Sequence, residues 1–377
     1  MRVIVVGAGP AGLYSAYLIR RHWPNADVTV LEQNPEGATF GFGVVFSDRA
    51  LEFLGAGDPE TVSAITPHLE SWECITLVHR GDPIAIDGIG FTAIGRLKLL
   101  SILQERLKSV GVVPRFNHAV QSVGELGEAD LVVVADGWNS FVRRHFQPAF
   151  GTTIDLRSNR FAWYGTQRRF DTLTQTFRKH DLGYFSAHHY RYAPDMSTFI
   201  VEVDAETFRR AGLEKMTDEE SRRVCERVFE EALDGEPLVS NRSIWRQFPN
   251  VRNQHWSHGR YVLVGDGLRT AHFSIGSGTR LAMEDAIALV KALRENEGDV
   301  PAALAAYENA RRPIVEKLVR AADASVTWYE HFPEHMKLDP YEFAMSYITR
   351  SGRIDLEKLR SISPNFVAGY GRARPAQ

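Results

Sequence analysis

The first 32 residues of this chain contain its most specific pattern. Residues 2–6 form a short apolar run, Gly7-Ala8-Gly9-Pro10-Ala11-Gly12 follow, and a second apolar run over residues 27–31 ends at Glu32. Each run is typical of a buried parallel strand, and apolar residues at helical spacing follow the glycines. A GxGxxG turn between a strand and a helix, with an acidic residue twenty positions past the last glycine, predicts a dinucleotide-binding βαβ unit.

Each residue of this motif has a physical task. Gly7 allows the tight turn, Gly9 lets a pyrophosphate approach the backbone, and Gly12 lets the helix pack close to the strand. The helix N-terminus offers N–H groups and partial positive charge to the phosphates. Glu32 can accept hydrogen bonds from the hydroxyls of the adenosine ribose.

Two later strand ends indicate that the dinucleotide is FAD rather than NAD. An apolar run over residues 130–135 ends in Asp136, and a run over residues 261–264 ends in Gly265-Asp266. Ligands of open α/β sheets bind at the carboxyl edge, where both carboxylates would lie. There Asp266 can hold hydroxyls such as those of a ribityl chain.

A glycine-rich turn follows Asp266 and precedes a helix predicted over residues 281–293. The turn contains Gly276, Gly278 and Thr279. It aims the helix N-terminus at whatever lies beside Asp266. If that group is the pyrimidine ring of a flavin, the partial positive charge favours the anionic reduced form.

These three segments together resemble the class A flavoprotein aromatic hydroxylases, which have the fold of para-hydroxybenzoate hydroxylase. Residues 94–100 resemble the Arg-x-x-Leu helix start of this family, which implies that Arg96 reaches FAD, and residues 307–313 resemble its C-terminal helix signature. The chain is most similar to the subgroup of salicylyl-CoA 5-hydroxylases, 2-aminobenzoyl-CoA monooxygenases and violacein-pathway tryptophan hydroxylases. The segments that resemble this subgroup are Phe40–Asp48, Trp163–Thr166, Met196–Glu202 and His272–Thr279.

The resemblance implies an enzyme that consumes NADH or NADPH and molecular oxygen. The reduced nicotinamide would dock transiently, and oxygen would add to the bound flavin to give a C4a-hydroperoxyflavin. Its distal oxygen is an electrophile, so the acceptor is an electron-rich ring. The resemblance favours an aryl-CoA thioester, above all salicylyl-CoA, which would be hydroxylated at C5 to gentisyl-CoA.

Several alternatives stay open at this point. A free indole or aromatic amino acid, or 2-aminobenzoyl-CoA, would be hydroxylated by the same chemistry. A flavin reductase that saturates alkenes would consume no oxygen, and a non-catalytic escort protein with an FAD fold would show no turnover. The chain also departs from the wider family, because Arg269 and His272 stand where the family usually has histidine and proline.

Three residues are candidates for contact with the reacting ring. In Ala187-His188-His189-Tyr190 neighbouring side chains point to opposite faces of a strand, so only one histidine can face a pocket. The Ala-His-x-Tyr pattern of the subgroup favours His188, with Tyr190 on the same face. His272, in the turn expected beside the flavin, is the rival candidate for a base.

A basic segment offers candidates for the phosphates of CoA. Seven arginines and lysines stand against two aspartates over residues 157–191, although the whole chain carries a net charge of −3. We therefore predict that Arg168 and Arg169 bind the nucleotide end of CoA through charge-assisted hydrogen bonds.

Composition excludes several other classes. The net charge argues against a nucleic-acid binder, and the apolar runs are too short to span a membrane. Cys74 and Cys225 are the chain's two cysteines, which rules out a disulfide framework. We expect no metal site, a cytoplasmic location because the chain enters a strand at once, and an assembly compatible with a homodimer.

The predicted fold class is α/β: a Rossmann-like FAD-binding domain, an interleaved antiparallel-sheet substrate domain and a C-terminal helical segment. Alternating strand-like segments mark the substrate domain, and the acidic stretch from residue 204 to 236 predicts two solvated amphipathic helices. We expect residues 1–70, 95–150 and 255–300 in the FAD-binding domain, 72–92 and 155–250 in the substrate domain, and 301–377 in the helical segment.

Overall fold

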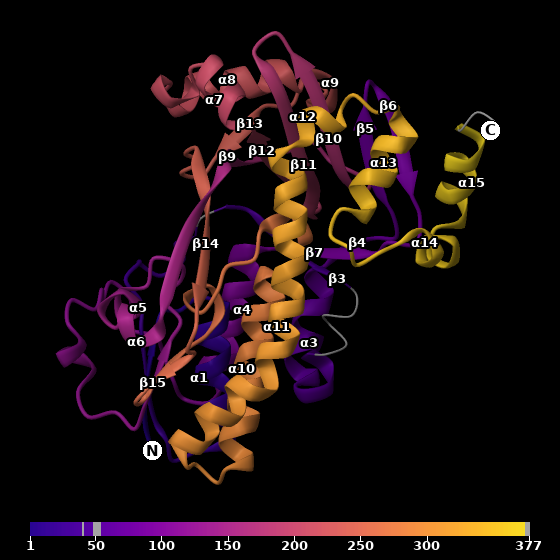
Figure 1. The fold of residues 1–377 in the computed structure, drawn as a ribbon. Helices are drawn as coiled ribbons and strands as arrows, with labels where there is room; N and C mark the ends of the chain where they lie inside the picture. Colours follow the sequence, from indigo (N-terminus) through magenta and orange to yellow (C-terminus); the bar gives the residue numbers. More distant parts are fainter. Residues whose placement is uncertain (40, 48–53, 374–377) are drawn as a thin grey trace.

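The structure is a computed structural model that describes residues 1–39, 41–47 and 54–373. Two parts of the molecule are visible in Figure 1, a helix-rich part that holds the N-terminus and a sheet-rich part at the opposite end. The long helix α11 (Val300–Glu330) runs from one part into the other. Phe40 and Asp48 of the Phe40–Asp48 segment lie outside the described residues.

A five-stranded sheet forms the centre of the first part. Its strand order is β15-β16-β8-β1-β2, and all neighbours are parallel except the β15–β16 hairpin. Burial on both faces explains the continuous valine runs of β1 and β8. The strands are β1 (Arg2–Val6), β2 (Asp27–Leu31), β8 (Leu131–Val134), β15 (Ser257–His258) and β16 (Tyr261–Leu263).

Four helices pack together beside this sheet, namely α1 (Pro10–His22), α4 (Arg96–Ser109), α10 (Gly278–Glu295) and α11. Helix α1 contacts both α4 and α10, and α11 packs against α10. Their apolar faces belong to the same core as the valines of β1 and β8. The helices and short helical turns of this part are α1 (Pro10–His22), α3 (Pro59–Ile65), η1 (Thr66–His68), α4 (Arg96–Ser109), η2 (Val123–Leu126), α5 (Phe141–His145), α6 (Gln147–Phe150), η4 (Gly265–Gly267), η5 (Phe273–Ile275) and α10 (Gly278–Glu295).

An eight-stranded sheet forms the second part. Its order is β13-β9-β12-β11-β10-β5-β6, and β14 pairs with the long strand β9. The expected antiparallel pairing holds except at one place, where β5 runs parallel to β10. The strands are β5 (Ile75–His79), β6 (Asp82–Ile86), β9 (Thr152–Thr166), β10 (Leu173–His180), β11 (Gly183–Ala193), β12 (Met196–Val203), β13 (Leu238–Ser240) and β14 (Arg246–Asn253).

Short helices cover one face of this sheet. The stretch from 204 to 236 forms three helices and a short turn rather than two helices, namely α7 (Ala205–Arg210), η3 (Leu213–Lys215), α8 (Asp218–Val228) and α9 (Glu230–Leu233). Their apolar sides bury Phe199 and Val201 of β12 in a separate core. The other face is therefore the one available to line a site.

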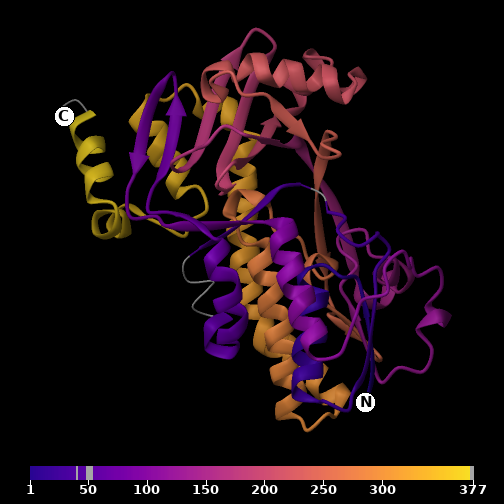
Figure 2. The same cartoon turned by 180° about the vertical axis from the view of Figure 1, so that it is seen from behind.

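The opposite face meets α11 and the C-terminal helices. Seen from behind, the C-terminal helices lie beside β5 and β6 at the outer end of the sheet (Figure 2). Phe177 packs there against Trp328 and Phe343. The helices are α12 (Phe332–His335), α13 (Pro340–Thr349), α14 (Leu356–Ile362) and α15 (Pro364–Ala373). Among the described residues, no helix is long and apolar enough to cross a membrane.

A three-stranded sheet joins the two parts. Its order is β3-β7-β4, with β3 (Gly43–Ser47), β7 (Phe91–Gly95) and β4 (Glu70–Trp72). A Cβ at Gly43 would lie 2.6 Å from the Cβ of Tyr192, and one at Gly165 would lie 2.5 Å from the ring of Phe42. The glycines of both segments thus allow the joining sheet to lie directly against the large one.

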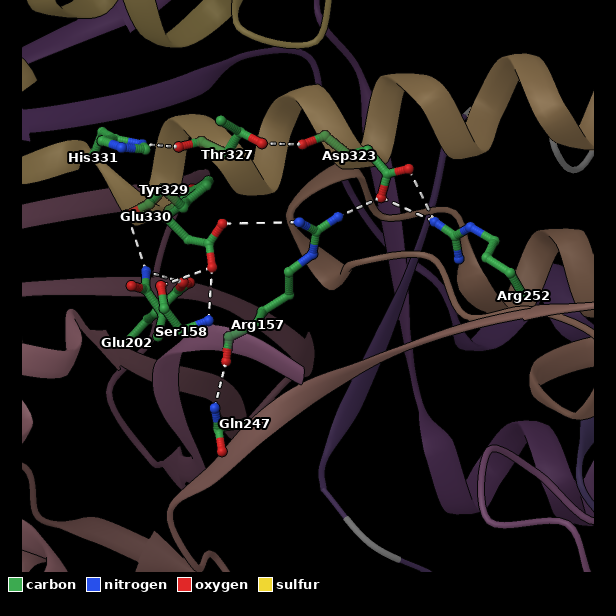
Figure 3. Close-up of polar contacts among 11 residues, drawn as sticks. Arg157, Ser158, Glu202, Gln247, Arg252, Asp323, Thr327, Tyr329, Glu330 and His331 are labelled. Carbon is green, nitrogen blue, oxygen red and sulfur yellow. Dashed lines mark hydrogen bonds and ion pairs between the residues drawn. The ribbon is translucent and has the colours of Figure 1, made fainter. Parts of the chain in front are cut away.

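Ion pairs fasten the long strands to α11. Figure 3 shows Arg157 of β9 between Asp323 and Glu330 of α11, with Arg252 of β14 on the other side of Asp323. The nitrogen–oxygen distances from Asp323 are 2.7 Å to Arg157 and 2.9 Å to Arg252, and the backbone nitrogen of Ser158 lies 2.6 Å from Glu330. Helix α11 is therefore held to the sheet where it passes between the two parts.

Candidate active site

The three strand ends predicted to converge do so. Their backbones are directly hydrogen-bonded: Ala135 donates to the Val6 carbonyl at 2.8 Å, and Val264 donates to the Val134 carbonyl at 3.1 Å. A side chain at Gly265 would lie 3.0 Å from the Cβ of Ala11. The turns after β1, β8 and β16 therefore form one surface at the carboxyl edge of the sheet, which we call the cradle.

Two glycines of the first turn are required by the protein itself. Gly7 has φ +101°, and a Cβ there would lie 2.4 Å from the carbonyl oxygen of Ala135. A Cβ at Gly12 would lie 1.9 Å from the carbonyl oxygen of Gly7. No side chain fits at either position, because the turn and the start of α1 are packed against the neighbouring strand end.

Gly9 is different, and the difference points to a ligand. A Cβ at Gly9 would meet no atom within 4 Å, and its φ of −76° suits any residue. The protein alone therefore does not need glycine here. Helix α1 begins at this point without a side-chain cap and without an acidic residue in its first turn, so its N–H groups remain available for an anion.

Glu32 is fixed beside this turn. Its carboxylate accepts hydrogen bonds from the backbone nitrogen of Ala8 at 2.7 Å and from that of Asn34 at 2.9 Å. The side chain is half-buried at the end of β2. A carboxylate held in this way retains lone pairs that can accept hydrogen bonds from ribose hydroxyls.

Polar groups without partners lie around the other two turns. Oδ1 of Asp136 and Nε of Arg96 are buried and have no hydrogen-bond partner in the described structure. Burial raises the pKa of Asp136. Burial also lowers the pKa of Arg96, and the charge of Asp266 opposes that shift. Buried polar atoms in proteins are almost always paired, so these atoms fit a cradle that holds a polar ligand such as FAD.

Asp266 lies at the start of the third turn. Its side chain is exposed, but the surrounding protein removes enough hydration to raise the pKa, an effect that the charges of Arg269 and Arg96 oppose. Beyond it Gly276 adopts φ +59°, and α10 begins at Gly278 and Thr279. The cradle thus brings Asp266 together with a helix N-terminus, as the chain order predicted.

A buried ion network supports the third turn, and sequence inspection did not foresee it. Asp285 of α10 accepts from the Gly265 backbone nitrogen at 3.0 Å, from Arg269 at 2.6 Å and from Arg311 at 3.1 Å. Glu284 also pairs with Arg311, and all four charged side chains are at most 5% exposed. The signal was present in the chain, because Arg311 belongs to the C-terminal helix signature and Arg269 replaces the histidine of the wider family.

A cavity of about 340 Å³ opens beside the cradle. One wall is the turn Ser274–Ser277 together with Val45 of β3, and another is the sheet face that carries Gln175 and His188. These two residues are direct neighbours in the β10–β11 register, so their side chains share one face. The cavity therefore places the sheet face opposite the turn that leads into α10.

His188 is the histidine that lines this cavity. It is 9% exposed, and neither ring nitrogen has a hydrogen-bond partner in the described structure. Burial, with a smaller contribution from the charge of Arg350, lowers the pKa of His188 to about 3. A neutral imidazole with two unpartnered nitrogens offers both a donor and an acceptor to a ligand. His189 points the other way, where it bonds to Thr176 at 2.9 Å.

The other two candidates are committed to the protein. Tyr190 donates its hydroxyl to the Gly43 carbonyl at 3.0 Å, and it is not among the residues that line the cavity. Nδ1 of His272 accepts from the Ser274 backbone nitrogen at 3.3 Å, and burial lowers the pKa of His272 to about 3. Neither residue lines the cavity, and each bonds to neighbouring backbone, so their contact with the reacting ring stays a prediction.

The two arginines predicted to bind CoA lie away from the cavity, and their contact with phosphate stays a prediction. Arg168 lies 3.6 Å from Asp234, Arg169 is exposed, and neither lines the cavity. The count of charges along the chain ignored the acidic helices that cover this edge of the sheet. The basic residues that do line the cavity come from α10 and the C-terminal segment, and they are Arg280, Arg350, Arg353 and Lys358.

A buried acid lies behind the cavity wall. The hydroxyl of Tyr329 donates to the side-chain oxygen of Gln175 at 2.9 Å, and Asn159 donates to the Tyr329 carbonyl at 2.9 Å and to Glu202 at 2.7 Å. Tyr329 and Glu202 lie beside the Arg157 ion pairs in Figure 3. Burial raises the pKa of Glu202 to about 8, and the Asn159 hydrogen bond opposes the rise. Hydrogen bonds through Tyr329 and Asn159 thus connect a cavity-lining amide to a carboxyl group whose pKa is raised by burial.

Comparison with known proteins agrees with this arrangement. The FAD binding domain family matches residues 110–322, and the NAD(P)-binding Rossmann-like domain family matches residues 5–39. Salicyloyl-CoA 5-hydroxylase of a Streptomyces species is 43% identical over 93% of this chain and 70% of its own length. Protodeoxyviolaceinate monooxygenase of Chromobacterium violaceum is 37% identical over 93% of this chain and 94% of its own.

A solved structure shows the same fold at lower sequence identity. The oxygenase of 2-methyl-3-hydroxypyridine-5-carboxylic acid superimposes with a TM-score of 0.72 over 93% of this chain and 96% of its own, at 18% identity. The predicted fold class, a Rossmann-like α/β domain with a sheet domain and a helical C-terminal segment, is confirmed by this likeness and by the family matches.

Proposed function

Because this chain belongs to the FAD binding domain family and is an FAD-dependent aromatic monooxygenase, we propose that it hydroxylates the ring of an aryl-CoA thioester, with salicylyl-CoA as the substrate. The observation that carries the proposal is one cavity that joins the cradle turn at Ser274–Ser277 to the unpartnered His188. The 43% identical salicyloyl-CoA 5-hydroxylase supports the choice of substrate.

Different residues of the cradle would hold different parts of FAD. The N-terminus of α1 and Gly9 suit the pyrophosphate, Glu32 suits the adenosine ribose, and Asp266 with Arg96 suits the flavin end. FAD, reduced by a nicotinamide nucleotide, would react with dioxygen and supply one electrophilic oxygen atom to the ring, while the other atom leaves as water. The protein's own part is to bind the flavin, orient the ring and exclude water.

His188 would hold the hydroxyl of the substrate. A salicylyl ring is most reactive para to its hydroxyl, and a hydrogen bond from that hydroxyl to a neutral imidazole increases the electron density of the ring. With a pKa of about 3, His188 is a poor base, so it would orient the hydroxyl rather than remove its proton. Gln175, fixed by Tyr329, would fix the ring from the neighbouring strand.

Oxygen uptake coupled to product formation tests this function. The purified holoenzyme is supplied with NADH or NADPH and, separately, with salicylyl-CoA, 2-aminobenzoyl-CoA, free salicylate and free tryptophan. We expect rapid oxygen uptake and a product heavier by one oxygen with salicylyl-CoA. Uptake without a hydroxylated thioester would contradict the proposal.

Hydroxylation of a free indole or aromatic amino acid is the second candidate. The 37% identity to protodeoxyviolaceinate monooxygenase favours it. Product formed only from the free aromatic compound in the same experiment would select this alternative.

A further inference from the structure

The outer half of the cavity is built by the C-terminal segment. Residues of α13, α14 and the loop between them line it, and the residues opposite them are Gly88–Gly90, between β6 and β7. His188 at one end is buried, whereas Arg353 and Lys358 of this segment are exposed. The cavity therefore has a buried end at the cradle and an open end, which we call the rim, at Arg353 and Lys358.

Hydrogen bonds lock the rim in place. The hydroxyl of Ser363 donates to the Asp87 carbonyl at 2.5 Å, and the carboxylate of Asp87 accepts from the Phe366 backbone nitrogen at 2.9 Å. A Cβ at Gly88 would lie 1.6 Å from the carbonyl oxygen of Ile362, so the two chain segments touch there. The segment that carries Arg353 and Lys358 is thus held to the loop on the other side of the opening.

Polarity changes along the cavity. At the buried end His188 and Gln175 are the polar groups of the sheet face, among buried apolar side chains such as Leu173 and Ile348. The half-buried side chains of Ile89, Ile354 and Ile362 belong to the outer half and form an apolar passage there. Such a sequence of environments suits a ligand with a ring at one end, a long uncharged arm and a charged group at the other end.

The charged side chains that line the cavity all have the same sign. Among the described residues that line the cavity, four are arginine or lysine and none is aspartate or glutamate. Arg350 is engaged inside, where it donates to the Ser274 carbonyl at 2.7 Å and to Ser325 at 2.9 Å, and Arg280 pairs with Glu284. Arg353 and Lys358 are the exposed members of the group, so they meet whatever leaves the opening.

We propose that Arg353 and Lys358 bind phosphate of a pantetheine carrier whose arm passes through the cavity. This proposal rests on the proposed function, and it adds that the C-terminal segment selects carrier-bound rings over free aromatic acids. A cavity of about 340 Å³ holds the ring and the arm but leaves the phosphate groups outside. Guanidinium and ammonium groups at the opening form charge-assisted hydrogen bonds with phosphate.

The test compares salicylyl-CoA with the salicylyl thioester of N-acetylcysteamine, which has the thioester but no phosphate. Arg353→Ala with Lys358→Ala should raise KM for salicylyl-CoA about 10- to 100-fold, because charge-assisted hydrogen bonds to phosphate are lost. Turnover of the phosphate-free thioester should not change. Arg360→Ala, an exposed arginine of α14 that does not line the cavity, is the matched control and should leave both substrates unaffected.

Binding provides a second readout. In calorimetry with the holoenzyme, affinity should fall from CoA to pantetheine for the unaltered chain, and this difference should shrink in the double variant. A salicylyl group on an acyl-carrier protein distinguishes the source of the phosphate. A defect with both carriers indicates the phosphate of phosphopantetheine, and a defect with salicylyl-CoA alone indicates the phosphates of the nucleotide.

The outcomes separate this proposal from the function beneath it. If the unaltered enzyme hydroxylates no thioester, the proposed function fails. If it hydroxylates salicylyl-CoA and the double variant keeps the same KM, the function stands and the rim proposal is overturned. An equally large defect of the double variant with the phosphate-free thioester would also overturn the rim proposal, because the effect would then arise from the cavity and not from phosphate.

Discussion

The cradle and the cavity are built in different ways, although they share the turn Ser274–Ser277. The cradle consists of three strand-to-helix turns, and in the first of them a Cβ would lie 1.9 Å from backbone at Gly12 and 2.4 Å from it at Gly7. The cavity is enclosed by side chains from β3, β10, β11, α10 and the C-terminal helices. The first geometry is fixed by the backbone and suits a cofactor common to a family. The second depends on side chains and can change with the substrate.

Two glycine substitutions give the largest expected effect and separate folding from cofactor binding. Gly12→Ala places a Cβ 1.9 Å from a carbonyl oxygen, so it should destabilise the fold by at least about 1–3 kcal/mol and abolish FAD binding. Gly9→Ala places its Cβ in open space, so stability of the FAD-free protein should be unchanged while FAD affinity falls. Flavin absorbance per mole of protein and thermal unfolding measure both, and equal FAD affinity in Gly9→Ala would contradict the cradle.

Substitution of the cavity histidine should leave the cradle intact. His188→Gln should lower the rate of product formation by about 10²-fold, because the ring loses its orientation, while the FAD content stays the same. His189→Gln, one position along on the other face of β11, should reduce thermal stability without reducing the yield of product per NADH oxidised. A His188→Gln enzyme that forms product at the rate of the unaltered enzyme would remove this residue from the site.

Low pH should lower the stability of the fold through the buried histidines at and near the cavity. The pKa values of His188 and His272 are about 3 in the folded protein, below their ordinary value of 6.5. The unfolded chain therefore binds more protons, so stability is complete above pH 6.5 and falls towards pH 3 by about 1.4 kcal/mol per pH unit for each histidine. Denaturant unfolding from pH 7 to 4 should show a shallower slope in His188→Gln. An unchanged slope would mean that this imidazole is hydrated.

Glu202 should give the opposite dependence of folding stability on pH. Its pKa of about 8 in the fold is above the ordinary value of 4.5, so the stability that it contributes is complete below pH 4.5 and falls as the pH rises to 8. Glu202→Gln keeps the Asn159 hydrogen bond without the titration, and it should therefore be more stable than the unaltered chain at pH 8 and about equal at pH 4.5. Denaturant unfolding at the two pH values checks this, and a variant that is weaker at both would show that the carboxyl is ionised in the fold.

The smallest effect is expected at Arg168 and Arg169. Arg168 pairs with Asp234 at the surface and Arg169 is exposed, so Arg168→Ala with Arg169→Ala should change KM for salicylyl-CoA less than about twofold. Steady-state kinetics beside the Arg353 and Lys358 double variant makes the comparison direct. A larger rise in KM at Arg168 and Arg169 would return the phosphate site to the location that the sequence predicted.

The same contrast explains what could be predicted from the chain alone. The cradle was predictable because each turn is a local pattern at the end of an apolar strand, and parallel strands bring such ends together. Alternation along β11 also predicted that only one of His188 and His189 lines the cavity. The catalytic and cofactor roles of the individual residues stay predictions.

The outer cavity was not predictable for a physical reason. One part of its wall forms because β5 pairs in parallel with β10, a strand that follows it by about one hundred residues. The other part forms because residues 340–362 fold back over Gly88. No local pattern marks either event. The position of Arg168 and Arg169 outside the cavity was not predictable either, because a count of charges does not show which acidic groups lie near them in space.

The contact between Gly88 and Ile362 has a consequence for anyone who wishes to redesign this protein. With the carbonyl oxygen of Ile362 where a methyl group would have to be, alanine at position 88 must displace α14, and larger residues must displace it further. The size of the side chain at position 88 therefore sets the distance between this loop and α14. A saturation library at this position would vary the width of the cavity opening without changing the residues at its buried end.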